Sequence, residues 1–130
     1  MPAATIRRYV LYFFIAFFAV FGITGLFAPA FIAGKLDLAP VALAGAAELR
    51  GFYGGGFLGF SLVILAGLRC QQAGSGLLLA MAIIMGSIAA GRLFSMALDH
   101  EFAFNIPAGI AELLVSATCY LESRAQTARA

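Results

Sequence analysis

Four long apolar stretches fill most of this chain of 130 residues. Hydrophobic residues make up 63% of the sequence and charged residues only 11%, which is too few to cover the surface of a soluble domain. A membrane-spanning helix needs about 20 mostly apolar residues, so four such helices with short loops use nearly the whole chain. The four stretches cover approximately residues 9–28, 48–68, 76–98 and 106–121. The sequence therefore predicts one all-α domain, residues 1–130, built as an integral membrane bundle of four transmembrane helices.

The basic residues predict how this bundle is oriented. In a four-span topology five arginines lie on one side of the membrane: Arg7, Arg8, Arg69, Arg124 and Arg129. Basic residues are enriched in cytoplasmic loops, so we expect the N-terminus and the C-terminus to be cytoplasmic. Amphipathic tyrosine rings favour the membrane interface, and three tyrosines lie at the same predicted boundary: Tyr9, Tyr12 and Tyr120.

Two opposite charges lie inside apolar stretches. Arg92 precedes the outer end of the third stretch by about six residues, and Glu112 follows the outer start of the fourth by about six. If these helices are antiparallel neighbours, both charges lie about 9 Å below the same membrane surface. An ionisable group at that depth is costly unless it is paired, which makes it a candidate functional site. We therefore predict a buried ion pair between Arg92 and Glu112.

Further polar residues gather in the outer third of the predicted bundle. Together with the charged pair they form a set of seven: Glu48, Arg50, Tyr53, Arg92, Ser95, Asp99 and Glu112. One interpretation is a structural network that fixes the register of the helices, because a guanidinium group can bridge carboxylates from different helices. The other is an externally open pocket for a lipid headgroup or small amphiphile. A proton or ion relay is a third.

Small residues at a spacing of four mark one face on each of two helices. They are Gly51, Gly55 and Gly59 on the second predicted helix and Ala82, Gly86 and Ala90 on the third. Small residues allow helix backbones to approach closely in a membrane. We predict that these two faces pack together, with a homodimer interface as the alternative.

The sequence lacks the marks of the common catalytic and cofactor sites. The glycines at 54, 56 and 59 fit a dinucleotide-binding spacing, but no strand precedes them and no acidic residue follows at the required distance. The single histidine, His100, excludes bis-histidine haem ligation within one chain. No nucleophile stands beside a base, and no metal cluster, P-loop or basic nucleic-acid stripe is present. We predict no catalytic residues, no metal and no cofactor.

Several short segments resemble a known family. They are Glu48-Leu49-Arg50-Gly51-Phe52-Tyr53-Gly54-Gly55, Gly91-Arg92-Leu93 followed by Ser95 and Asp99, and Glu112 in the last helix. The chain resembles a small bacterial membrane family catalogued as a domain of unknown function (number 4345), which is distantly similar to DoxX-type four-helix proteins. The resemblance implies a multi-pass protein of the bacterial inner membrane. The DoxX likeness implies an accessory role beside quinone-linked redox enzymes.

Two functional hypotheses follow. The first is a non-catalytic protein that binds a lipid headgroup, quinone or similar amphiphile at the outer site. The second is an accessory subunit that packs on a larger membrane complex, redox or photosynthetic, with the polar residues as internal scaffolding. We also expect Asn105 to cap the last helix, and the polar tail from Ser123 to Ala130 to fray.

Overall fold

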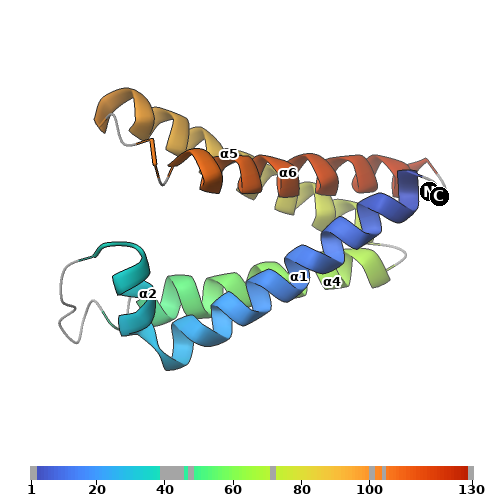
Figure 1. Cartoon of the computed structure of the whole chain (residues 1–130). Coiled ribbons are helices and arrows are strands. Elements are labelled where there is room, and N and C mark those ends of the chain that lie inside the picture. Colours follow the sequence, from blue (N-terminus) through green and yellow to red (C-terminus); the bar gives the residue numbers. More distant parts are fainter. Residues whose placement is uncertain are drawn as a thin grey trace. The chain divides into compact units, whose positions relative to one another are not determined.

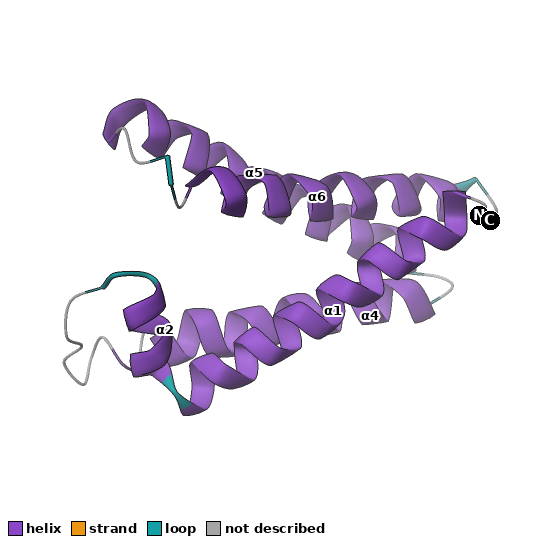
Figure 2. Cartoon of the chain, viewed as in Figure 1, coloured by secondary structure: helices purple, strands orange, loops and turns teal. Residues whose placement is uncertain are grey.

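A computed structural model describes residues 3–38, 46, 49–70, 73–99, 102–103 and 105–128. Within these residues every regular element is helical, as Figure 2 shows, so the predicted all-α fold is confirmed. The elements are α1 (Ala3–Phe27), α2 (Pro29–Lys35), the π-helix η1 (Arg50–Gly56), α4 (Phe57–Arg69), α5 (Gly74–Asp99) and α6 (Asn105–Thr127).

The chain divides into two compact units. We call Met1–Tyr12 with Val63–Ala130 the hairpin unit, and Phe13–Leu62 the aromatic unit. Each has its own buried residues and its own hydrogen bonds, and each is described by itself below.

The hairpin unit is built on α5 and α6, which lie side by side in Figure 1. Leu78, Met81 and Met85 of α5 recur every three or four residues and are almost fully buried. Val115 and Cys119 of α6 are buried as well, again four residues apart. The two apolar faces therefore supply most of the interior of the hairpin.

The aromatic unit depends on glycines where α1 crosses η1. A Cβ atom added at Gly25 would lie 2.7 Å from the backbone nitrogen of Gly54. One added at Gly22 would lie 2.9 Å from the Gly54 carbonyl oxygen. Any larger side chain would push the two helices apart, so glycine is required for this close approach. The Ser61 hydroxyl adds a hydrogen bond of 3.0 Å to the Ile15 carbonyl oxygen.

Aromatic rings fill the space beside these glycines. The Phe18 ring packs edge-on against the Phe57 and Phe60 rings, with centroids 5.5 and 5.8 Å away. Phe21 contacts the other side of this cluster, 5.3 Å from the Phe57 ring centre. Such pairs add to the attraction gained from burial alone. The rings therefore help to hold α1 against α4.

The two predicted small-residue faces, on the second and third predicted helices, differ in what lies next to them. Among the described residues, a Cβ atom at Gly51 or Gly59 would meet nothing within 4 Å. On α5, a Cβ atom at Gly86 would lie 3.2 Å from the Ser116 hydroxyl, which donates a hydrogen bond of 2.7 Å to the Ala82 carbonyl oxygen. The α5 face thus packs against α6. Packing between the second and third predicted helices stays a prediction.

Two helices extend beyond their predicted ends. α1 begins at Ala3, and α6 continues to Thr127. Ser123 is buried and donates a hydrogen bond of 2.8 Å to the Ser75 carbonyl oxygen. The Gln126 amide donates another, of 3.1 Å, to the Gly67 carbonyl oxygen. The sequence predicts that the tail frays from Ser123 onward. This prediction is wrong for residues 123–127, which are helical.

The segment after α1 and the start of the second predicted helix also differ from a simple helix–loop–helix pattern. Pro29 begins the short helix α2, where its missing amide hydrogen is tolerated. The chain leaves α2 through Asp37, whose φ of 54° is a left-handed conformation that aspartate tolerates. Further on, Arg50–Gly56 is a π-helix that runs directly into α4.

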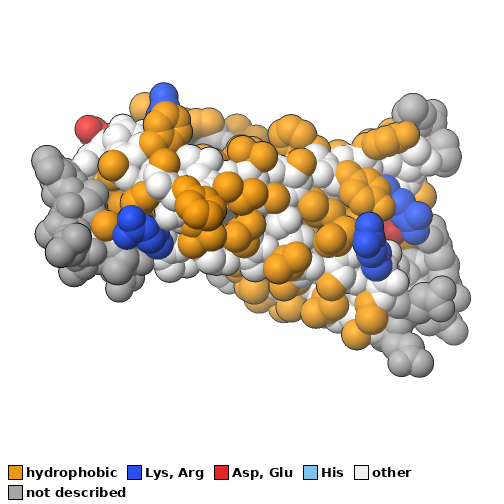
Figure 3. All heavy atoms as spheres, turned by 90° about the horizontal axis from the view of Figure 1, so that it is seen from below, with side chains coloured by type: hydrophobic (Ala, Val, Ile, Leu, Met, Phe, Trp, Pro, Cys, Tyr) orange, Lys and Arg blue, Asp and Glu red, His pale blue; other side chains and the backbone are white. Residues whose placement is uncertain are grey.

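Two helices of the described chain are long and apolar enough to cross a membrane: Ala3–Phe27 and the continuous segment Arg50–Arg69. α5 contains a shorter apolar segment, Gly74–Ala90. Figure 3 shows apolar side chains over much of the face that it presents, with the basic side chains in small separate groups. These features favour a membrane protein, whereas the four-span bundle and the location of its termini stay predictions.

Candidate functional site

Arg92 and Glu112 form an ion pair that joins α5 to α6. The Arg92 Nε atom lies 2.7 Å from Oε1 and 2.8 Å from Oε2 of Glu112. The terminal Nη2 atom also lies 2.7 Å from Oε1. A guanidinium group that donates to a carboxylate through two nitrogens fixes orientation as well as distance.

The helical hairpin brings these side chains together. α5 ends at Asp99 and α6 begins at Asn105, and the two charged residues each lie about two turns from that connection. The Arg92 side chain keeps 24% of its surface exposed and the Glu112 side chain 15%. The pair is therefore largely withdrawn from the surroundings but can still be reached.

Asn105 belongs to the same site, although the sequence suggested only a capping role for it. It is the first residue of α6 and is buried, and its Oδ1 atom accepts a hydrogen bond of 3.4 Å from Nη1 of Arg92. An asparagine at a helix start usually indicates a cap, so its position alone gave no sign of this contact. Gly109 lies beside the arginine stem, since a Cβ atom there would lie in ordinary van der Waals contact with the Arg92 Cδ atom, 3.8 Å away.

The other members of the predicted polar set are not part of this described cluster. Ser95 and Asp99 lie on α5, but their side chains are outside the described part of the structure, as is the whole of Glu48. Arg50 and Tyr53 belong to the aromatic unit.

Arg50 and Tyr53 have partners within the aromatic unit. The Nε atom of Arg50 donates a hydrogen bond of 3.2 Å to the Leu26 carbonyl oxygen, close to the end of α1. The Tyr53 ring stacks on the Phe57 ring with 5.7 Å between centroids. The contacts of both residues therefore join η1 to neighbouring parts of its own unit.

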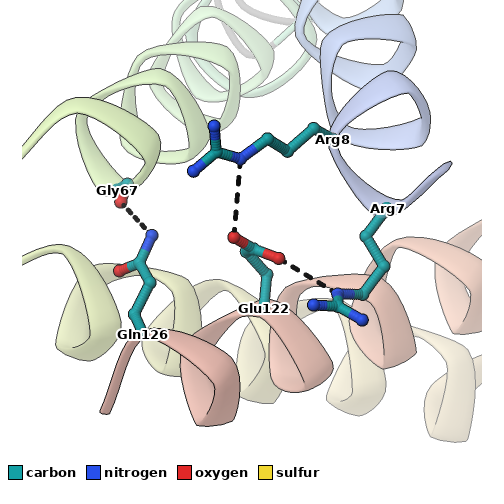
Figure 4. A network of polar contacts seen from close by, with 5 residues as sticks. All are labelled: Arg7, Arg8, Gly67, Glu122 and Gln126. Atoms are coloured by element: carbon teal, nitrogen blue, oxygen red, sulfur yellow. Dashed lines mark hydrogen bonds and ion pairs between the residues drawn. The ribbon is translucent and has the colours of Figure 1, made fainter. Parts of the chain in front are cut away.

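A second charged cluster lies at the other end of α6, and the sequence-based search for functional residues missed it. Glu122 is fully buried, and its Oε2 atom accepts a hydrogen bond of 3.0 Å from the Nε atom of Arg7. The Nε atom of Arg8 lies 3.8 Å from Oε1. Figure 4 shows the two arginines approaching the carboxylate from different sides. The only sequence signal was the Arg7–Arg8 pair itself, which served to predict topology.

The Arg92 site offers both hydrogen-bond donors and hydrogen-bond acceptors. A guanidinium group stays protonated in proteins, so Arg92 donates but does not act as a base. Glu112 and Asn105 contribute acceptor oxygens. This combination suits recognition of a polar headgroup better than proton transfer.

Comparison with known proteins gives one match. No curated protein and no solved structure is significantly similar to this chain. The family described as "Domain of unknown function (DUF4345)" matches residues 6–122, which include the Arg92–Glu112 pair and Glu122. The match covers nearly the whole sequence and bears out the resemblance of the polar segments. The chain therefore belongs to the DUF4345 family.

Proposed function

We propose that this chain is a non-catalytic integral membrane protein that binds the polar head of an amphiphile, such as a lipid or a quinone, at Arg92 and Glu112. The observation that carries this proposal is the partly exposed, doubly hydrogen-bonded ion pair between the two adjoining helices α5 and α6. An ionisable pair in such a setting indicates a functional site by default.

The pairing also supports a four-span arrangement. Arg92 and Glu112 would each oppose insertion of an isolated helix, but their charges cancel within the hairpin. α5 and α6 are longer than the roughly 20 residues that a span requires. Together with the two longer apolar segments, Ala3–Phe27 and Arg50–Arg69, they would make a bundle of four.

The basic residues support the orientation of this bundle. Arg7, Arg8, Arg69 and Arg124 lie at the ends of helices that would share one membrane face. That face would be cytoplasmic, with both termini inside and the Arg92 site in the outer leaflet. A bacterial inner membrane fits this arrangement and the resemblance described above.

Recognition would use both partners of the ion pair. A quinone carbonyl or a lipid phosphate would accept hydrogen bonds from Arg92, while a hydroxyl or ammonium group would donate to Glu112. Burial of an ion pair is weak evidence for a purely stabilising role, because loss of hydration offsets much of the attraction.

Native mass spectrometry of the full chain, extracted gently from its own membrane, tests the proposal. We expect a discrete bound mass on the single chain that Arg92→Gln and Glu112→Gln both abolish. Arg124→Gln is the matched control, since it removes the same charge from an exposed position at the far end of α6. A bare wild-type chain, or a bound mass that persists in both site variants, would contradict the proposal.

The alternative is an accessory subunit of a larger membrane complex, in line with the distant DoxX likeness. It is favoured by large apolar side chains next to the ion pair, since Leu93, Leu113 and Leu114 each expose half or more of their surface. A partner helix would cover them. Under this alternative the chain is recovered with other subunits, and Arg92→Gln leaves that association intact.

A further inference from the structure

A groove runs along one face of α1 near its N-terminal end, away from the Arg92 site. Its volume is about 430 Å³, and it is lined by Ala4, Thr5, Arg8, Tyr9 and Tyr12. These residues recur at intervals that place them on one side of the helix. The groove therefore combines one cation, three hydroxyl groups and two aromatic rings.

The charge balance beside the groove leaves Arg8 available for an anion. Arg7 and Arg8 share the single carboxylate of Glu122, so the three groups carry one net positive charge. Arg7 makes the hydrogen bond at 3.0 Å, whereas the Nε atom of Arg8 is 3.8 Å from Oε1, too far for one. The Arg8 side chain is also 52% exposed. It can turn toward the groove while Glu122 keeps Arg7.

The tyrosines place this cation in a particular chemical setting. Tyr9 is 62% exposed and Tyr12 50% exposed, so each presents an apolar ring that ends in a hydroxyl group. Such rings favour the level of lipid headgroups, and arginines near that surface attract anionic lipids. Arg8, Tyr9 and Tyr12 thus have the chemistry to contact the phosphate, the glycerol and the first methylene groups of a phospholipid.

We infer that this groove binds the headgroup of an anionic phospholipid at the membrane face that carries the N-terminus. Arg8 pairs with the phosphate, and the Thr5, Tyr9 and Tyr12 hydroxyls form hydrogen bonds with oxygen atoms of the headgroup and glycerol. This inference shares with the proposed function only the placement of the chain in a membrane. It uses different residues and does not depend on a ligand at Arg92.

The test is lipid retention by the purified full chain in native mass spectrometry. Phosphatidylglycerol is the anionic probe, and phosphatidylcholine with the same acyl chains is the zwitterionic one. We expect about five-fold stronger retention of phosphatidylglycerol, since one arginine contributes about 1 kcal/mol near an anionic surface. Arg8→Gln should remove this preference. The titration is repeated in Arg92→Gln, so that lipid held at the Arg92 site is not counted.

Arg69→Gln is the matched control, because Arg69 is exposed at the end of α4 and does not line the groove. It should keep the preference. Equal retention of the two lipids by the wild-type chain would overturn the inference without any variant. An equal loss of the preference for phosphatidylglycerol in Arg69→Gln and Arg8→Gln would also overturn the inference. Displacement of the lipid by millimolar inorganic phosphate would identify a free-phosphate site and overturn it too.

Discussion

Arg7 and Glu122 are 115 positions apart in the sequence, yet their side chains meet at 3.0 Å. The contact ties the first turns of α1 to the last turns of α6, near opposite ends of the chain. Because the Glu122 carboxylate is completely buried, its charge needs a nearby cation, and Arg7 is the arginine that donates a hydrogen bond to it.

Replacing Glu122 should therefore destabilise the hairpin unit. Glu122→Gln removes the charge but keeps the shape, and it leaves Arg7 without its anionic partner. We expect a loss of about 2 kcal/mol, the usual scale of a hydrogen bond to a charged group. Thermal unfolding in detergent measures it. Arg124→Gln, at an exposed site two residues away, should have almost no effect, and an equal shift in both variants would contradict this role.

Arg92 and Glu112 should be energetically coupled. Arg92→Leu and Glu112→Leu each leave a partly buried charge without its partner, whereas the double variant removes both charges. A double-mutant cycle should then give a coupling energy of about 1–2 kcal/mol. Denaturant unfolding of the four proteins supplies the values. Purely additive losses would show that the contact contributes nothing to folding.

Gly25 and Gly59 should respond differently to alanine. A Cβ atom at Gly25 would clash with backbone atoms of Tyr53 and Gly54, so Gly25→Ala should cost about 1–3 kcal/mol. At Gly59 a Cβ atom meets nothing among the described residues, and alanine also favours helix formation. Gly59→Ala should be neutral or stabilising in thermal unfolding. A large loss there would instead support the predicted packing of the second helix on the third.

Cysteine labelling checks the proposed topology. Cys70 is exposed just after α4, whereas Cys119 is buried and should not react. With both termini inside, a membrane-impermeant maleimide should label Cys70 in inverted membrane vesicles but not in intact cells. Cys70→Ser should lose the signal altogether. Labelling in intact cells would place this turn outside and reverse the topology.

Sequence reasoning identified Arg92 and Glu112 because the relevant geometry is local. Both residues lie near one short connection, so helical rise alone sets them at the same level. Glu122 gave no such signal. It lies next to the polar tail, and its partners at the other end of the chain become neighbours only through the packing of the hairpin unit. Contacts of this kind depend on tertiary structure that hydrophobic periodicity does not specify.

The glycines show a similar limit. A spacing of four reveals that Gly51, Gly55 and Gly59 share a helix face. It does not reveal which neighbouring helix that face contacts. The close approach in the aromatic unit uses Gly54 with Gly25 instead. Helix rotation is set by packing against neighbours, and the sequence pattern alone leaves it open.

The π-helical segment Arg50–Gly56 has a consequence for how the length of the chain can change. Each hydrogen bond in a π-helix encloses one more residue than in an α-helix. Loss of Gly55 or Gly56 would therefore let the segment relax toward α-helical winding while α4 keeps its phase. The same deletion within α5 would turn the later side chains of α5 by about 100° relative to the earlier ones and disrupt the face that packs against α6. A single-residue deletion at Gly55 or Gly56 should therefore be tolerated better than one within α5.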